Sequence, residues 1–153
     1  MPRDYETLVA AAPTRGTRDE RLRLVTDLLW DALHPTGVSW CGFYVEDRAA
    51  SDAARLVLAC CRDAPACSPI GLHGVCGQSY ISRATRIVED VSALGAHYIA
   101  CDPRDRSEIV VPCLDASGAC WGVLDVDSWD LASFDVHDDA GLRRVLRAAQ
   151  LTT

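Results

Sequence analysis

The chain has 153 residues, of which 49% are hydrophobic and 24% charged, the ordinary composition of a soluble globular protein. Its formal net charge of −7 argues against nucleic acid and against an anionic membrane as partners. No stretch is long and apolar enough to span a bilayer, and no apolar signal core precedes the eight cysteines. We therefore expect a single cytoplasmic domain over residues 1–153, with cysteines that act as thiols, ligands or catalytic groups.

The N-terminal third of the chain predicts a helix followed by two strands. Apolar residues recur at three- and four-residue steps over residues 17–33, and Thr17 with Glu20 has the spacing of a capping box. Pro35 and Gly37 end this helix, because neither residue type continues one easily. Two strands are then expected on either side of a polar turn, over residues 38–45 and 55–61.

The middle of the chain contains most of the residues that break regular structure. Residues 64–77 hold three glycines and two prolines and predict an irregular loop. A short helix over residues 78–83 and a strand over residues 86–90 are expected next. Residues 92–107 show little periodicity and carry many reactive side chains, which predicts a long loop of the kind that often forms functional sites.

The C-terminal third predicts a hairpin and a final helix. Strands over residues 108–114 and 120–127 flank a short turn that contains Asp, Ser and Gly. An amphipathic helix is expected over residues 137–149. This order of elements predicts an α+β fold, an antiparallel sheet with helices packed on one side.

Alternation along three of the strands gathers aromatic and acidic side chains. Residues two apart on a strand point to the same face, so Trp40 lies with Tyr44, and Asp125 with Asp127. Acidic residues are depleted in strands. Two interpretations remain open: the exposed side of an edge strand, or a cup for a small polar ligand with a positive group and an apolar tail. The cup would be lined by Trp40, Tyr44, Glu108, Asp125 and Asp127.

Carboxyl groups gathered in such a cup would change one another's protonation. Like charges resist joint ionisation, so neighbouring carboxylates raise one another's pKa. One of Glu108, Asp125 and Asp127 could then keep its proton near neutral pH and act as a general acid.

Cys101 is the cysteine best placed for chemistry. It lies in the loop 92–107, close in sequence to His97, Arg104 and Arg106, and ahead of a strand that is expected to be buried. These cations could lower the pKa of its thiol, whereas the neighbouring acids oppose that effect. The sequence leaves open which effect prevails.

The other cysteines fall into three groups. Cys67 and Cys76 lie in the irregular segment 64–77 and can reach a neighbouring loop. Cys60 and Cys61 end a strand and are ambiguous. Small buried apolar roles are expected for those in strands, Cys41, Cys113 and Cys120. A zinc site is a minor alternative, because the chain has no Cys-x-x-Cys pair; its ligands would be Cys67, His73, Cys76 and either His97 or Cys101.

Seven segments occur in an order that matches one known family. They are Ser39–Tyr44, Pro65–Cys67, Gly74–Gly77, Val88–Val91, Ile99–Asp102, Arg106–Pro112 and Gly122–Ser128. Together they resemble the free methionine-(R)-sulfoxide reductases, which are built on a GAF domain. The resemblance covers nearly the whole chain, and the block from Cys101 to Pro112 is quite specific to this family.

The resemblance implies a fold, an activity and a set of thiols. The fold would be a GAF-like domain whose central antiparallel sheet of about six strands is flanked by helices, and a homodimer is expected. The activity would be reduction of free L-methionine-(R)-sulfoxide to L-methionine, with thioredoxin as external reductant and no metal or organic cofactor. Cys101 would be the nucleophile, Cys67 the principal resolving cysteine and Cys76 an auxiliary thiol.

The resemblance also assigns the cup and exposes departures from the family. Glu108, Asp125 and Asp127 would bind and protonate the sulfoxide oxygen, while the aromatic pair Trp40 and Tyr44 would hold the methyl group. Extra thiols stand where the family has a Gly-Pro-like segment, and an inserted residue precedes the nucleophile; these departures are Cys60, Cys61 and Tyr98. The disulfide partner of the nucleophile therefore stays open. The alternative function is a GAF sensor module that binds a small molecule without catalysis.

Overall fold

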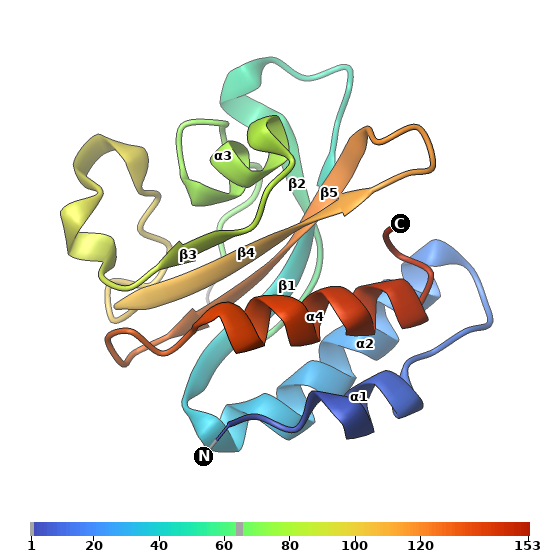
Figure 1. The fold of residues 1–153 in the computed structure, drawn as a ribbon. Helices are drawn as coiled ribbons and strands as arrows, with labels where there is room; N and C mark the ends of the chain where they lie inside the picture. The colour runs from blue at the N-terminus through green and yellow to red at the C-terminus, as the bar shows by residue number, and fades with distance from the viewer. Residues whose placement is uncertain (1, 64–65) are drawn as a thin grey trace.

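A five-stranded antiparallel sheet forms the centre of the computed structural model, which describes residues 2–63 and 66–153 (Figure 1). The strands are β1 Val38–Glu46, β2 Leu56–Arg62, β3 Arg86–Val88, β4 Ser107–Leu114 and β5 Cys120–Ser128. They lie side by side in the order β2-β1-β5-β4-β3, and each neighbouring pair is antiparallel. These are the five strands expected along the sequence, and their number is close to the six or so that the family resemblance implies.

Three helices lie on one side of the sheet, and one helix lies on the other side (Figure 1). The first three are α1 Tyr5–Ala11, α2 Arg18–Leu33 and α4 Val136–Ala148, and the fourth is α3 Val75–Ser82. The expectation that all helices pack on one side was therefore wrong for α3. No helix among the described residues is long and apolar enough to cross a membrane.

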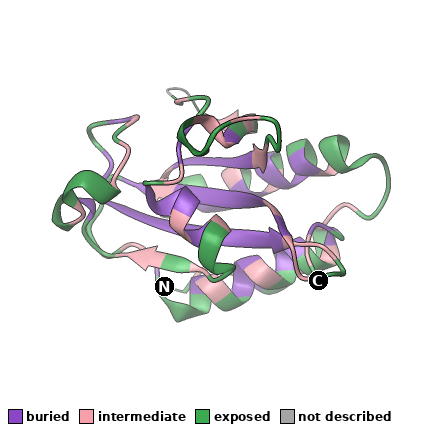
Figure 2. Ribbon diagram, turned by 90° about the horizontal axis from the view of Figure 1, so that it is seen from above, coloured by how far each residue is buried: buried purple, intermediate pink, exposed green. Residues whose placement is uncertain are grey.

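The larger hydrophobic core fills the space between the sheet and α1, α2 and α4. Alternate residues of the central strands point into it, as the sequence pattern predicts. Phe43, Leu124, Ile109 and Leu142 are all completely buried there. Figure 2 shows this burial along the central strands.

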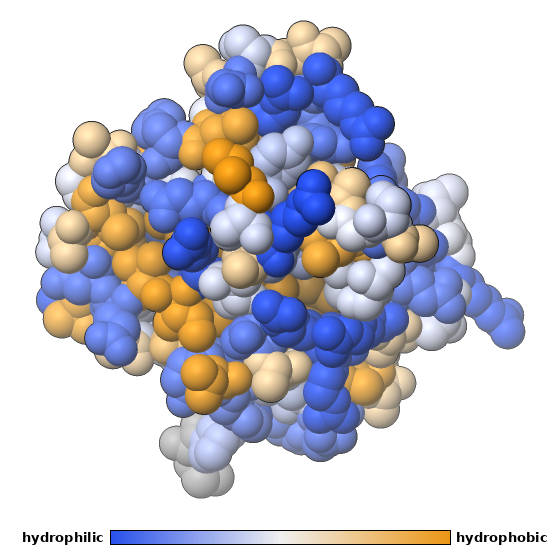
Figure 3. Space-filling model, turned by 45° about the horizontal axis from the view of Figure 1, so that its top comes forward, coloured by the Kyte–Doolittle hydropathy of each residue, from blue (hydrophilic) through white to orange (hydrophobic). Residues whose placement is uncertain are grey.

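A second, smaller core lies on the opposite face of the sheet, under α3 and the loops around it. Trp40 and Tyr44 of β1 pack there with Val75 and Cys76 of α3. This side of the molecule therefore has its own apolar packing, which supports the loops that carry Cys67 and Cys101. In Figure 3, which tilts the top of the molecule forward, hydrophobic and hydrophilic patches are interspersed on the surface.

Two helix starts show how well local signals work in this chain. The predicted capping box of α2 is present, because Glu20 N donates to Thr17 Oγ1 at 3.2 Å and Thr17 N donates to Glu20 Oε2 at 3.1 Å. Helix α1 was not predicted, because its seven residues bury only Tyr5 and Leu8. It is held by tertiary contacts, including a hydrogen bond of 2.7 Å from Tyr5 Oη to Asp138 Oδ1.

Helix α3 begins three residues earlier than the sequence predicts, at Val75 rather than at Gln78. It includes Cys76 and Gly77, which the sequence analysis placed in the loop 64–77. Gly77 is present because the Leu72 backbone passes so close that a Cβ would overlap it. The first two residues of that expected loop, Ala64 and Pro65, lie outside the described residues.

Candidate active site

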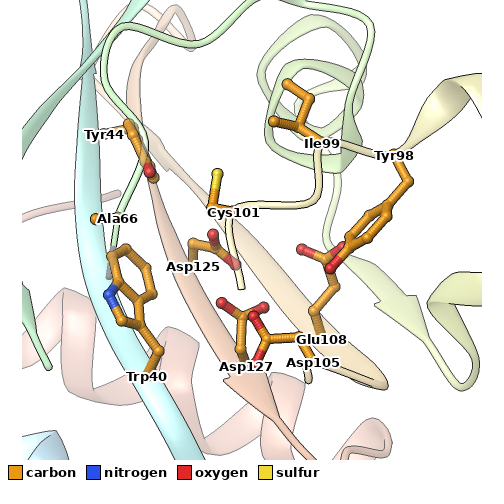
Figure 4. A pocket seen from close by; sticks show the side chains of 10 residues that line it. All are labelled: Trp40, Tyr44, Ala66, Tyr98, Ile99, Cys101, Asp105, Glu108, Asp125 and Asp127. Atoms are coloured by element: carbon orange, nitrogen blue, oxygen red, sulfur yellow. The ribbon is translucent and has the colours of Figure 1, made fainter. Parts of the chain in front are cut away.

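A pocket with an empty volume of about 340 Å³ opens on the α3 face of the sheet (Figure 4). Its floor comes from the central strands and its cover from the loops that follow β2 and β3. Its lining residues are Trp40, Tyr44, Ala66, Tyr98, Ile99, Cys101, Asp105, Glu108, Asp125 and Asp127. The five residues of the predicted cup are all among them.

Strand register sets the order of side chains on the pocket floor. Asp127 of β5 pairs with Trp40 of β1 on one side and with Glu108 of β4 on the other. The next row on this face places Asp125 opposite Gly42, and a Cβ on Gly42 would lie 2.6 Å from Cη2 of the indole. Glycine at this position therefore lets the Trp40 ring lie along the strand.

The aspartates of β5 do not lie on an exposed edge, which was one of the two interpretations of the sequence. Strand β5 is the middle strand of five. Asp125 is buried and Asp127 is partly exposed. The edge-strand interpretation is therefore wrong, and the acidic face of β5 forms the floor of a pocket.

Three carboxyl groups converge on this floor. Oxygens of Glu108, Asp125 and Asp127 lie within 4.8 Å of one another. Glu108 is 4% and Asp125 is 8% exposed, and neither Glu108 Oε1 nor Asp125 Oδ1 has a hydrogen-bond partner among the described residues. Buried acceptors without partners are costly, so these oxygens are available to a ligand.

Burial raises the pKa of all three carboxyl groups, and the charge of a neighbouring acid, Asp105 in the case of Asp125, raises it further. Burial is the main cause in each case, and it raises the pKa of Asp125 to about 7. The pKa of Glu108 lies well above its usual value through burial and then the Asp125 charge. The pKa of Asp127 is likewise raised by burial and by its acidic neighbours. The pocket floor therefore holds protons near neutral pH.

A fourth acid, Asp105, lines the same pocket and was not predicted as a site residue. Its side chain is 9% exposed, and Ser39 Oγ donates to its Oδ1 at 3.1 Å. Burial raises the pKa of Asp105 to about 6. Asp105 lies in a loop, where no periodicity indicates which way a side chain points, so the sequence carried no signal for it.

Cys101 and Cys67 form a disulfide at the cover of the pocket, with their Cα atoms 5.5 Å apart. The Cys67 segment is held along β2 and β1. Tyr44 Oη donates to the Cys67 carbonyl at 2.8 Å, and Leu58 N donates to Ser68 Oγ at 3.0 Å. Two loops that are 34 residues apart in the sequence are thus joined over the carboxyl groups.

Cys76 lies in α3 and is buried beside the pocket rather than in an irregular loop. A neighbouring hollow connects it with Cys101, Glu108 and Asp125. Burial, followed by the Asp125 charge, raises the pKa of its thiol well above the usual value. The structure therefore places Cys76 near the floor as a protonated thiol.

The remaining cysteines divide by the face of the sheet on which they lie. Cys41, Cys113 and Cys120 are buried, as predicted. Cys60 packs against the larger core and lies 3.3 Å from Thr26 Oγ1, so it faces away from the pocket. Cys61 packs with the smaller core, on the pocket side.

The cations near Cys101 in sequence do not line the pocket. Arg104 Nε and Nη2 each donate to the Asp102 carboxylate at 3.0 Å, and its guanidinium lies 4.2 Å from the Trp129 ring centre. His97 and Arg106 are exposed. The groups that face the pocket beside Cys101 are acids rather than bases.

The zinc ligands suggested by the sequence are not brought together. Cys67 and Cys101 are bonded to each other, and His73 is exposed. Across residues 2–63 and 66–153, the one group of three or more convergent potential ligands is Glu108, Asp125 and Asp127. An all-carboxylate set suits a hard cation rather than zinc.

The sequence and the fold are both similar to those of known proteins, although no family model matches the chain. The free methionine-R-sulfoxide reductase of Saccharomyces cerevisiae is 37% identical over 125 residues, which cover 80% of this chain and 68% of the relative. The enzyme of the same name from Escherichia coli is 36% identical over 148 residues, covering 95% of this chain and 82% of the relative.

The chain belongs to the free methionine-(R)-sulfoxide reductase family. Solved structures of this group share its fold. An X-ray structure of the Neisseria meningitidis reductase in complex with its substrate has a TM-score of 0.80 and 33% identity, covering 97% of this chain and 87% of the other. A structure described as a GAF domain has a TM-score of 0.79 and 30% identity, covering 97% and 83%. The predicted α+β GAF fold is confirmed.

Proposed function

We propose that this protein reduces free L-methionine-(R)-sulfoxide to L-methionine at the pocket between Cys101 and the carboxyl groups of the sheet. The observation that carries the proposal is a disulfide between Cys101 and Cys67 directly over three convergent, proton-holding acids. Sulfoxide reduction needs both parts, a thiol to attack sulfur and an acid to protonate the departing oxygen. Membership of the reductase family supports the same activity.

The first step forms a sulfenic acid. The Cys101 thiolate attacks the sulfoxide sulfur and forms a transient sulfur–sulfur bond, while one acid of the floor protonates the sulfoxide oxygen. The hydroxyl then passes from the substrate sulfur to the Cys101 sulfur: the substrate sulfur–oxygen bond and the sulfur–sulfur bond break, an oxygen–sulfur bond forms on Cys101, and L-methionine leaves beside Cys–SOH. Asp125, with a pKa of about 7, and Glu108 and Asp127, whose pKa values are raised well above the usual ones, can hold this proton at neutral pH.

The second step forms the disulfide that the structure contains. The Cys67 thiol condenses with the sulfenic acid and releases water, and the two loops are then joined. We assign the resolving role to Cys67 rather than to Cys60, which faces the other core, or Cys76, which lies buried in α3. An external dithiol returns both cysteines to thiols by exchange, and thioredoxin is the proposed donor.

The aromatic side of the pocket binds the apolar end of the substrate. The Trp40 and Tyr44 rings lie 6.1 Å apart between centroids and are both buried. They border the same pocket as Cys101, so a methyl group on the reacting sulfur can rest against them. No metal or organic cofactor has a role in this scheme.

A sensor module that binds a small molecule without catalysis remains the second candidate. Ligand binding alone would need neither the disulfide nor three acids with raised pKa values beside it, so the reductase is favoured. The homodimer and the cytoplasmic location expected from the sequence stay predictions.

The test is an assay that couples thioredoxin and thioredoxin reductase to NADPH oxidation. We expect turnover with free (R)-methionine sulfoxide, little with the (S) form, and none with (R) substrate in Cys101→Ser. Cys60→Ser, whose thiol faces the other core, is the matched control and keeps wild-type turnover. Absence of (R)-dependent turnover in the wild type, or full turnover in Cys101→Ser, would refute the proposal.

A further inference from the structure

The charged residues that line the pocket are all acidic. Four of its ten residues are acids, Asp105, Glu108, Asp125 and Asp127, and none is lysine, arginine or histidine. Arg104, the cation adjacent to Asp105 in the chain, is held by two hydrogen bonds to Asp102. Buried carboxylates without a cation are costly, so a ligand with a positive group would relieve this pocket.

Asp105 approaches the other three acids from a different part of the chain, and its charge raises the pKa of each of them. The oxygens of Glu108, Asp125 and Asp127 form one group within 4.8 Å, and Asp105 does not belong to it. Asp105 comes from the loop before β4, whereas the others come from strands (Figure 4). Its Oδ1 accepts a hydrogen bond from the Ser39 hydroxyl. The pocket thus has two acidic places, a clustered floor and a single carboxyl group beside it.

Protonation separates the same two places. The pKa of Asp105 is about 6, because burial and the Asp102 charge raise it while the Ser39 hydrogen bond and Arg104 lower it. The pKa of Asp125 is about 7, and those of Glu108 and Asp127 are raised well above their usual values. With a pKa of about 6, Asp105 can carry a negative charge at neutral pH.

We propose that Asp105 binds the α-ammonium group of the substrate and thereby selects a free amino acid over a residue within a peptide. The inference rests on the proposed function and assigns different roles in it to Asp105 and to the three clustered acids. The clustered acids keep the protons that the sulfoxide oxygen needs, while Asp105 supplies the negative charge that the ammonium group needs. A peptide-bound methionine sulfoxide has an amide nitrogen in this position and loses the ion pair.

The experiment compares two sulfoxides in wild type and in Asp105→Asn. One is free (R)-methionine sulfoxide, and the other is (R)-4-(methylsulfinyl)butanoic acid, the same molecule without its amino group. We expect Asp105→Asn to lose roughly 10- to 100-fold in kcat/KM on the amino acid, mostly through KM, because a charge-assisted hydrogen bond disappears. The loss on the amine-free compound should be less than about threefold, and Asp105→Glu should recover part of the activity.

Controls keep a general loss of charge or of folding from imitating this result. Glu89→Gln removes one exposed carboxylate next to the end of β3 and should leave both substrates unaffected. Asn fits the space of Asp105 and can still bond to Ser39, so the thermal midpoint should not fall. Equal losses of Asp105→Asn on both compounds would overturn the inference.

Product binding separates a failure of this inference from a failure of the proposed function. Calorimetry measures the binding of L-methionine and of 4-(methylthio)butanoic acid to the reduced protein, without any turnover. A preference of wild type for L-methionine that Asp105→Asn abolishes would support ammonium recognition even if no sulfoxide were reduced. No such preference, or a preference that survives in Asp105→Asn, would refute it even if the reductase activity were found.

Discussion

At the scale of single residues, Asp125 is a buried acid whose environment opposes its charge. It lies in the middle strand of the sheet, and its Oδ1 has no hydrogen-bond partner among the described residues. Its pKa in the folded protein, about 7, is far above the ordinary value of 3.8 for an aspartate. The folded state therefore holds this proton more tightly than the unfolded chain does, and protein stability must depend on pH.

The sign of this dependence follows from the raised pKa. Below about pH 4 Asp125 is protonated in both states and does not affect stability. Between about pH 4 and 7 the unfolded chain releases this proton while the folded protein keeps it, so the unfolded state is increasingly favoured. We expect the free energy of unfolding to fall between pH 4 and 8 in wild type, and less steeply in Asp125→Asn. At pH 8 the variant should be more stable by on the order of 1–3 kcal/mol.

Urea unfolding at pH 5 and pH 8 measures this effect. Asp115→Asn is a suitable control, because Asp115 accepts hydrogen bonds in a surface turn and its pKa is lowered, chiefly by Ser117. A variant Asp125→Asn that is less stable than wild type at pH 8 would show that Asp125 is ionised and compensated in the folded state.

The sequence predicted those site residues that lie on strands. Trp40, Tyr44, Glu108, Asp125 and Asp127 line one pocket because strand alternation determines which face each side chain takes. Asp105 was missed, since its loop has no periodicity and its direction is set by tertiary contacts such as Ser39. For the same reason the sequence could not choose among the cysteines, whereas the structure places Cys67 against Cys101.

At the scale of elements, α3 links the second core to the pocket. It carries Cys76 beside the carboxyl floor, and it packs so closely on the preceding loop that the Leu72 backbone fills the place of a Cβ on Gly77. Backbone cannot move aside as easily as the end of a side chain. A methyl group here must displace α3 or the loop.

We expect Gly77→Ala to lower kcat/KM by roughly tenfold or more and to lower stability by about 1–3 kcal/mol, the usual cost of overpacking.

Gly141→Ala is the matched control. Its new methyl group would overlap the Tyr5 ring, so it should destabilise the contact between α1 and α4. Because that contact lies across the sheet from the pocket, its kcat/KM should stay within about twofold of wild type at a temperature where the protein is folded. Equal activity losses in both variants would contradict this assignment.

Element prediction succeeded where burial follows a regular period. Helix α2 and strands β1, β4 and β5 agree with the expected ranges within one residue at each end, because their apolar faces meet the cores. Helix α1 was missed because it has only two buried residues. The start of α3 was missed because Gly77 suggests a loop, whereas its real role is to permit close backbone packing.

At the scale of the whole molecule, the strand order β2-β1-β5-β4-β3 creates the site. It places β5, from the C-terminal third, between β1 and β4, so that Asp127 meets both Trp40 and Glu108. Pairing between strands about 80 residues apart leaves no local signal, so the element order predicted an antiparallel α+β fold but not this strand order. The family resemblance added a GAF-like sheet of about six strands and likewise no strand order. The assignment of residues 1–153 to a single domain stays a prediction.

The division of the molecule into two faces also explains its chemistry. The larger core with α1, α2 and α4 supports the sheet, and the other face carries the acids, the aromatic pair and the loops of the two bonded cysteines. Reduction of the disulfide removes the covalent link between those two loops, and neither of its cysteines belongs to the larger core. The reaction cycle can therefore change the cover of the pocket while the floor stays in place.

The most direct test of the central claim is a single turnover of the fully reduced protein. One equivalent of free (R)-methionine sulfoxide is added with no reductant, free methionine is quantified, and the new disulfide is located by peptide mass spectrometry. The account predicts close to one methionine per chain and a bond between Cys67 and Cys101; Cys67→Ser should still release methionine but form no such bond. Absence of methionine release, or a disulfide that joins other cysteines in the wild type, would contradict it.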